Sequence, residues 1–134
     1  MAFYLEGDMK QNRLLKWIPA VLVMGSIFWF SSQPSDALPV FSWADTIVKK
    51  SGHVLGYALL TFSCFYALDM EPKRRWLTWF LAMLYAATDE FHQSFVHGRY
   101  PSVWDILVFD NLGALLSLWI TGRYIKQKRP DEKI

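Results

Sequence analysis

The chain contains little of what a secreted, disulfide-bonded or nucleic-acid-binding protein needs. Its one cysteine, Cys64, lies inside an apolar run, so it forms no intrachain disulfide. We expect no cleavable signal peptide, because the residues before Trp17 are polar and the apolar run that follows has no small-residue cleavage site. Charged residues make up only 19% of the chain. The basic segments flank hydrophobic runs, which indicates contacts with anionic lipid and no nucleic-acid partner.

Apolar residues are abundant, and they are gathered in long blocks. Hydrophobic residues make up 53% of the 134 positions and aromatic residues 17%, which is high for a soluble domain. We therefore predict an all-α protein, a four-helix transmembrane bundle with spans at 14–30, 42–68, 76–95 and 102–121. In terms of domains, a membrane domain at 17–121 lies between basic cytoplasmic tails at 1–16 and 122–134.

Helix-breaking residues separate the predicted spans. The first run stops at Ser31-Ser32-Gln33-Pro34, because proline disfavours helix in the residue before it. Two Ser-x-x-Asp sequences, at 42–45 and 102–105, each predict a capping box that opens a helix. Pro72 lies near the first position of the third helix, where its missing N–H costs nothing. Residues 98–101, Gly-Arg-Tyr-Pro, break the chain before the fourth span.

Lysine and arginine are distributed unevenly over the two sides that this topology defines. All 14 of them lie at the amino terminus, in the 69–75 turn or at the carboxyl terminus, except Lys49, Lys50 and Arg99. Short cytoplasmic loops are rich in Lys and Arg. We therefore expect a multi-pass protein of the bacterial cytoplasmic membrane with both termini in the cytoplasm. The other ends of the helices then face the exterior.

The sequence Asp89-Glu90-Phe91-His92-Gln93 closes the third hydrophobic run. Ionisable groups in a membrane helix are costly and indicate a functional site by default. At about 100° per residue, both acids and Gln93 share an arc with small residues, and His92 lies at its edge. Small residues let a neighbouring helix approach, whereas bulky apolar residues face lipid. The bulky residues opposite the acids are Leu77, Phe80, Leu84, Phe91 and Phe95.

The other spans carry polar groups toward the same outer end. In the fourth span, Gly113 and Ser117 form a small-xxx-small pair on the face that holds an acid. We expect all four helices to deliver polar side chains to one outer pocket. These are Lys49, Lys50, His53 and Tyr57 of the second span, Asp110 of the fourth, and Ser31, Ser32 and Gln33 at the end of the first.

These residues resemble the VanZ-like family of small polytopic bacterial membrane proteins. The matching sequences are Phe30-Ser-Ser-Gln-Pro34, Lys50-Ser-Gly-His53-Val-Leu-Gly-Tyr57, Asp89-Glu90-Phe-His92-Gln93, Gly98-Arg99, and then Asp105, Asp110 and Gly113. The resemblance covers roughly Trp17 to Thr121. It implies a four-helix membrane protein related to low-level teicoplanin resistance. In the family pattern the two acids of the last helix lie four residues apart, but Asp105 and Asp110 are five apart. Asp105 therefore joins the pocket only if the helix is locally bulged.

The predicted site has a catalytic group and a binding group. The catalytic residues are Asp89, Glu90, His92 and His53, and the substrate-binding residues are Gln93, Arg99, Asp110, Tyr57, Lys50, Gln33 and Ser32. A structural alternative remains open for each of them. In that alternative the acids order the bundle, Arg99 neutralises them, Asp105 completes its capping box, and Tyr57 or a carbonyl satisfies His53. His97 is expected to be exposed near the interface.

The sequence assigns no metal or other cofactor. His53, Asp89, Glu90, His92 and His97 are suitable metal ligands, but their spacing matches no zinc signature such as His-Glu-x-x-His.

Three functions remain open from the residues. An enzyme would use Asp89 or Glu90 with His92 for acid–base chemistry on a lipid-linked or wall precursor. A binding protein would recognise an envelope component or an amphiphilic lipoglycopeptide with the same groups, or the groups would only order the bundle. A proton-coupled carrier would need an oligomer, because four helices leave little room for a pathway. The expected partners are membrane lipids and such an amphiphile, the oligomeric state stays open, and the expected outcome is altered glycopeptide susceptibility.

Overall fold

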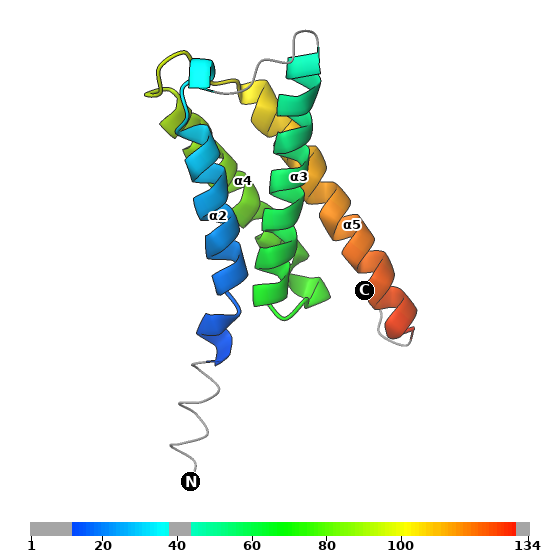
Figure 1. Ribbon diagram of the computed structural model, residues 1–134. Coiled ribbons are helices and arrows are strands. Elements are labelled where there is room, and N and C mark those ends of the chain that lie inside the picture. Colours follow the sequence, from blue (N-terminus) through cyan, green and yellow to red (C-terminus); the bar gives the residue numbers. More distant parts are fainter. Residues whose placement is uncertain (1–11, 38–43, 131–134) are drawn as a thin grey trace.

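The computed structural model describes residues 12–37 and 44–130, and every regular element within them is helical (Figure 1). The predicted all-helical fold with four helices is confirmed over these residues. The four helices are α2 (Ile18–Ser31), α3 (Ala44–Ala67), α4 (Arg75–Gln93) and α5 (Asn111–Lys128). Shorter segments join them: the 3₁₀ turns η1 (Ser35–Ala37) and η2 (Pro72–Arg74), and the π-helix η3 (Asp105–Asp110).

The first helix begins later than its hydrophobic pattern predicted. Residues 12–15 form a separate helical turn, and α2 starts at Ile18 with Pro19 in its first turn. Proline is tolerated there because the first N–H groups of a helix have no partner within the helix. The end of α2 at Ser31 is within one residue of the prediction. The predicted capping box at 42–45 lies outside the residues whose side chains the structure describes.

The turn between α3 and α4 reverses the chain with two left-handed residues. Asp69 and Met70 have φ angles of 63° and 50°, and the Met70 N–H donates to the carbonyl of Phe65 at 2.8 Å. This bond satisfies one of the last carbonyls of α3. Lys16 forms an ion pair with Asp69, so the residues before α2 are tied to this turn.

The second predicted capping box, at 102–105, is wrong. In a capping box the acid would accept the N–H of Ser102, but that N–H donates to Glu90 Oε2 at 2.8 Å. Asp105 instead forms an ion pair with Lys50. The chain then runs as a π-helix from Asp105 to Asp110. The π-helix is wider than an α-helix, so residues five apart lie above one another.

Helix α3 lies in the middle of the bundle, with α2 and α5 on either side and α4 crossing behind (Figure 1). The closest helix packing involves Gly113 of α5. A Cβ atom at this position would lie 2.2 Å from the carbonyl oxygen of Val54 and 3.0 Å from the amide nitrogen of Ala58. The small-residue face of α5 therefore packs directly on the α3 backbone, as its sequence predicted.

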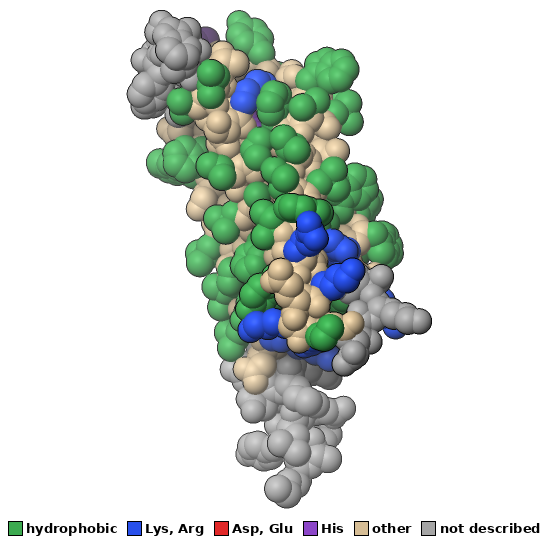
Figure 2. All heavy atoms as spheres, turned by 90° about the vertical axis from the view of Figure 1, so that its right-hand side faces the viewer, with side chains coloured by type: hydrophobic (Ala, Val, Ile, Leu, Met, Phe, Trp, Pro, Cys, Tyr) green, Lys and Arg blue, Asp and Glu red, His purple; other side chains and the backbone are tan. Residues whose placement is uncertain are grey.

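Large apolar side chains cover much of the outer surface. Trp29 of α2 is 65% exposed, Phe91 of α4 70% and Trp119 of α5 57%, and Figure 2 shows such side chains over most of one face. Patches of this extent are typical of surfaces that contact lipid or a partner. Two helical segments, Asn12–Ser31 and Asp105–Lys128, are long and apolar enough to cross a membrane. Together with the lipid-facing surface, they indicate a membrane protein.

Basic side chains gather at one end of the molecule, where α2 begins and α5 ends (Figures 1 and 2). Arg75 joins two elements there, because its Nη2 donates to the carbonyl of Leu118 at 2.7 Å. We call this region the basic end. Its described cations are Arg13, Lys16, Lys73, Arg74, Arg75, Arg123, Lys126, Lys128 and Arg129.

Candidate functional site

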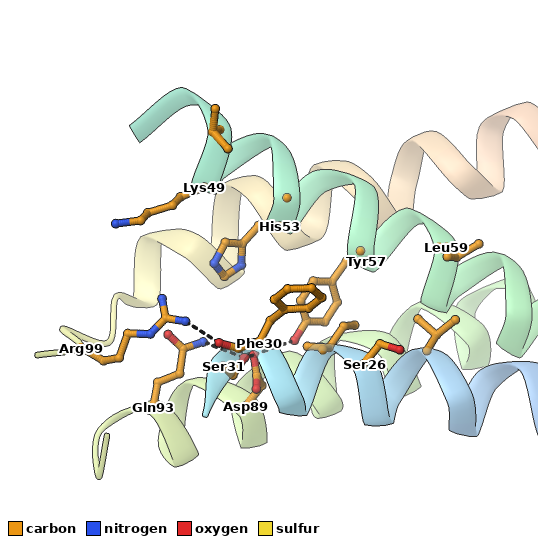
Figure 3. Close-up of a pocket in the computed structure, with 15 residues that line it drawn as sticks. Ser26, Phe30, Ser31, Lys49, His53, Tyr57, Leu59, Asp89, Gln93 and Arg99 are labelled. Carbon is orange, nitrogen blue, oxygen red and sulfur yellow. Dashed lines mark hydrogen bonds between the residues drawn. The ribbon is translucent and has the colours of Figure 1, made fainter. Parts of the chain in front are cut away.

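Asp89 is the centre of a hydrogen-bond network at the other end of the molecule, which we call the acidic end. Its side chain is 4% exposed, because it lies on the packing face of α4 as predicted. Its Oδ2 atom accepts from Ser31 Oγ at 2.8 Å, from Gln93 Nε2 at 3.1 Å and from the Tyr57 hydroxyl at 3.5 Å. Its Oδ1 atom is buried without a hydrogen-bond partner. The network joins α2, α3 and α4 (Figure 3).

His53 is held by an acid from the fourth helix. Its Nδ1 lies 2.8 Å from Oδ1 of Asp110, whose side chain is 1% exposed. The interpretation that Tyr57 or a carbonyl satisfies His53 is therefore wrong. The Tyr57 ring instead lies nearly parallel to the imidazole, with centroids 6.4 Å apart. A carboxylate on Nδ1 fixes the orientation of the ring and leaves Nε2 for another contact.

Glu90 and Asp105 lie close to His53 and take no part in the hydrogen bonds described above for the Asp89 side chain. Glu90 is 6% exposed, and its Oε1 has no partner. Asp105 is brought near by the π-helix, so the bulge that the five-residue spacing required is present. Lys50 pairs with Asp105 and not with Asp89 or Glu90. His53, Glu90 and Asp105 each offer one ligand atom within 4.8 Å of the others.

Arg99 does not neutralise the acids. Its Nε donates to the carbonyl of Gln33 at 3.1 Å and its Nη2 to that of Phe30 at 2.7 Å. These bonds satisfy carbonyls that the end of α2 leaves open. Gly98 makes the turn that aims Arg99, since its φ is +71° and a Cβ there would lie 2.3 Å from Ser35 Oγ. The Gln33 side chain donates to the Trp29 carbonyl in the last turn of α2, so it is not part of the network.

His92 occupies a separate contact between α2 and α4. Its Nε2 lies 3.0 Å from Ser32 Oγ, and its ring stacks on Phe28 with centroids 4.3 Å apart. Among the described residues, no hydrogen bond joins His92 to Asp89 or Glu90. The imidazole near the buried acids is therefore that of His53. His97 is exposed, as predicted.

A cavity of about 460 Å³ lies between α2 and α3, beside the Asp89 network. Its volume is within the range of small-molecule sites. Most of its wall is apolar, but one end is polar and is lined by Lys49, Arg99 and Asp89 (Figure 3). Toward the opposite end the wall includes Ser26 and Leu59. The cavity thus has the polarity of an amphiphile, with one polar end and one apolar body.

Three of these residues were not among the predicted catalytic and binding residues. Ser31 was expected at the outer end of the first span beside Ser32 and Gln33, and the structure buries it against Asp89. Asp105 was assigned to a cap because its spacing from Asp110 fits no α-helical face. Lys49 lies on the same face as His53, and that shared face was the available signal.

Comparison with known proteins supports the resemblance noted from these residues. No curated protein and no solved structure matches the chain. A family model, described as VanZ/LLP1, matches residues 15–124. The match includes all four helices up to Tyr124 and every residue of the Asp89 and His53 networks. The chain therefore belongs to the VanZ/LLP1 family.

Proposed function

We propose that the protein crosses the bacterial cytoplasmic membrane four times, with the basic end in the cytoplasm and the acidic end toward the cell wall. The enrichment of Lys and Arg at one end supports this orientation. Residues 17–121 form the membrane domain in this proposal, and both tails are cytoplasmic.

Cysteine labelling in intact cells tests this orientation. His97 at the acidic end and Lys126 at the basic end are both exposed, so His97→Cys and Lys126→Cys form a matched pair. Cys64 is buried and is replaced by alanine in both. We expect a membrane-impermeant maleimide to label position 97 in intact cells and position 126 only after the cells are opened. The reverse pattern would overturn the orientation.

Within this orientation, we propose that the protein binds an amphiphile of the cell envelope. The observation that carries this proposal is the cavity between α2 and α3, with its apolar wall and polar end. An acyl or prenyl chain fits the wall formed by Val23, Ile27 and Leu59. A head group fits the polar end, where Ser31, Tyr57 and Asp89 supply hydrogen-bonding groups and Arg99 supplies a positive charge.

The charge at the polar end favours an anionic head group. Arg99 uses two of its N–H groups on backbone carbonyls, and a guanidinium has five donors. Lys49 lines the same end. A lipid-linked wall precursor has the required combination of a phosphate, sugar or peptide groups and a long apolar chain. Binding of such a precursor would alter the targets of glycopeptides, and we expect an effect on teicoplanin susceptibility.

Native mass spectrometry of the purified protein tests the amphiphile. Gly56 lines the cavity, and a Cβ there would lie 3.7 Å from the Ile27 side chain, so Gly56→Leu fills the apolar part. Gly25 has no such neighbour within 4 Å, so Gly25→Leu is the matched control. We expect the wild type and Gly25→Leu to retain a lipid or wall precursor and Gly56→Leu to lose it. Equal retention by both variants would exclude the cavity as the site.

An acid–base activity at Asp89 is the second candidate function. The observation that favours it is the buried Asp89 Oδ1, which has no partner although Oδ2 accepts from Ser31, Gln93 and Tyr57. A carboxylate oxygen beside a cavity can take a proton from a bound hydroxyl or amide. Asp89→Asn keeps the shape and removes this capacity. Full teicoplanin tolerance in a folded Asp89→Asn protein would exclude catalysis and leave binding.

A further inference from the structure

A second group of side chains, distinct from the Asp89 network, lies between α3, α4 and η3. His53, Glu90 and Asp105 come from these three elements, and one ligand atom of each lies within 4.8 Å of the others. Imidazole and carboxylate groups are the ligands that divalent transition ions take from proteins. The folding of the chain therefore brings together three possible metal ligands that are far apart in sequence.

The Glu90 side chain provides a second, independent observation that indicates a bound ligand. Its side chain is 6% exposed, and Oε1 has no hydrogen-bond partner among the described residues, whereas Oε2 accepts the Ser102 N–H at 2.8 Å. A buried carboxylate oxygen without a donor is unfavourable, because it has lost its hydrogen bonds to water without a replacement. A bound cation removes that cost. The second oxygen of Asp110 is also buried without a partner.

The arrangement around His53 resembles the support that metal-bound histidines receive. Asp110 lies 2.8 Å from Nδ1, and a carboxylate on one ring nitrogen fixes the tautomer and orients the other nitrogen toward a metal. Asp110 is 1% exposed, so solvent does not compete for this bond. The contact places the lone pair of the neutral ring on Nε2.

Charge balance also favours a divalent ion. With neutral His53, the carboxylates of Glu90, Asp105 and Asp110 are opposed here by the Lys50 ammonium, which pairs with Asp105. The cluster then has two net negative charges, which are costly in a low-dielectric interior. A divalent cation makes it neutral. The negative charges of Glu90 and Asp105 would balance the ion, and the negative charge of Asp110 would balance Lys50.

We propose that His53, Glu90 and Asp105 bind a divalent first-row transition ion, Zn²⁺ or Mn²⁺, and that Asp110 orients His53. In a tetrahedral zinc site, bond lengths of about 2.0–2.1 Å place ligand atoms about 3.4 Å apart. The three side chains therefore close toward the ion by rotation about their χ angles. The second oxygen of Asp105 is the one that Lys50 does not hold. Three protein ligands leave a coordination position for water or a ligand.

The ion site does not rest on the proposed amphiphile. His53 belongs to both sites, whereas Glu90 and Asp105 are not among the residues that line the cavity. A lipid retained without the ion, or an ion retained by Gly56→Leu, separates the two proposals. Where both are present, the ion lies beside the polar end of the cavity and can contact a phosphate there.

Metal binding to the purified full chain in detergent tests the proposal. The protein is stripped with a chelator and titrated with ZnCl₂ or MnCl₂, with bound metal measured by elemental mass spectrometry and affinity by calorimetry. We expect one ion per chain. Glu90→Gln and Asp105→Asn should each weaken binding by at least about tenfold, the scale on which even outer ligand partners act. A wild type that takes up no stoichiometric ion would overturn the site and leave protonated carboxylates as the neutralising groups.

Two controls and one spectroscopic measurement make this result specific. Asp36 and His97 are exposed and lie outside the cluster, so Asp36→Asn and His97→Gln should bind as the wild type does. If the metal affinity fell equally in these controls and in Glu90→Gln, the ion would be bound at the surface, which would contradict the proposal. Co²⁺ absorption in the visible range reports the ligand set, and we expect the spectrum to change in His53→Gln. An unchanged spectrum would exclude His53 as a ligand.

Discussion

The two ends of this molecule hold their charges in opposite ways. At the basic end, Lys16 and Asp69 form a pair whose side chains are 37% and 45% exposed. At the acidic end, Asp89, Glu90 and Asp110 are all buried, and each retains one oxygen without a partner. Exposed charges are stabilised by solvent, whereas buried charges need donors or counterions.

This difference indicates what each end is for. In the proposed orientation, the basic end needs only positive charge at the cytoplasmic surface of the membrane, so the exact partners of its side chains matter little. The acidic end holds its acids by contacts from α2, α3 and α4 and from the Ser102 N–H, and these contacts include the Ser31 hydroxyl and His53. Groups that are buried at a cost and left partly unsatisfied mark a site prepared for a ligand.

The largest effect is expected from single-residue deletions in the last helix. Leu107 lies in the π-helix and Leu115 in α5, and both side chains are about half exposed. Deleting Leu107 converts the wide turn to an α-helix and places the two flanking acids four residues apart, so we expect the protein to fold. Deleting Leu115 rotates the rest of α5 by about 100° and removes Ser117 and Leu118 from the interface. We expect monodisperse protein in detergent for the first deletion and aggregation for the second. If both deletion variants aggregated, the π-helix would not be a local insertion of one residue.

A second experiment compares the packing around two glycines of α5, Gly113 and Gly122. Gly113→Ala places a methyl group against the α3 backbone, at 2.2 Å from the Val54 carbonyl oxygen, whereas Gly122→Ala meets the flexible end of Arg75. We expect Gly113→Ala to lower the free energy of unfolding by about 3 kcal/mol. This is the upper end of the usual cost of overpacking, because the α3 backbone cannot move away. For Gly122→Ala we expect about 1 kcal/mol, the net value of the Arg75 hydrogen bond. Thermal unfolding in detergent measures both, and equal losses would contradict the close approach of α3 and α5.

A third experiment compares a buried acid with an exposed one. Asp89→Ala leaves the donors of Ser31 and Gln93 without their acceptor, which costs about 1–3 kcal/mol. Asp69→Ala removes the exposed pair with Lys16, which is worth about 0–1 kcal/mol. Denaturant unfolding of both variants gives the two free energies. A larger loss for Asp69→Ala would mean that the basic end, and not the Asp89 network, holds the bundle together.

The smallest effect is the pH dependence of the basic end. The hydrogen bond from Lys16 lowers the pKa of Asp69 below its ordinary value of 3.8. Because the folded value is lower than the unfolded one, the pair stabilises the protein above the unfolded pKa, and this contribution disappears as the pH falls through the folded pKa. For a pair this exposed we expect at most about 0.5 kcal/mol. The difference in unfolding free energy between the wild type and Asp69→Asn should therefore shrink from pH 7 to pH 3. A constant difference would exclude the ion pair as its source.

The sequence by itself determined the helices and the faces they present. The period of apolar residues predicted the burial of Asp89 and Glu90 and the exposure of Phe91 and Phe95, because helical phase depends only on residue spacing. Gly113 predicted a close helix contact for the same reason. The ends of α3 and α4 were predicted to within a few residues by Pro72 and the 98–101 turn, since proline and left-handed glycine act locally.

Only the tertiary structure decided which polar groups meet. Nothing in the order of residues favours Asp110 over Tyr57 as the partner of His53, or a carbonyl over an acid as the partner of Arg99, because those contacts join residues 57 and 66 positions apart. The π-helix between Asp105 and Asp110 depends on packing against α3 and α4 and has no local signature. It decides whether Asp105 caps a helix or lies beside Glu90 and His53. Partner choice is a property of helices packed together, since rotation and depth relative to a neighbour are set by the neighbour.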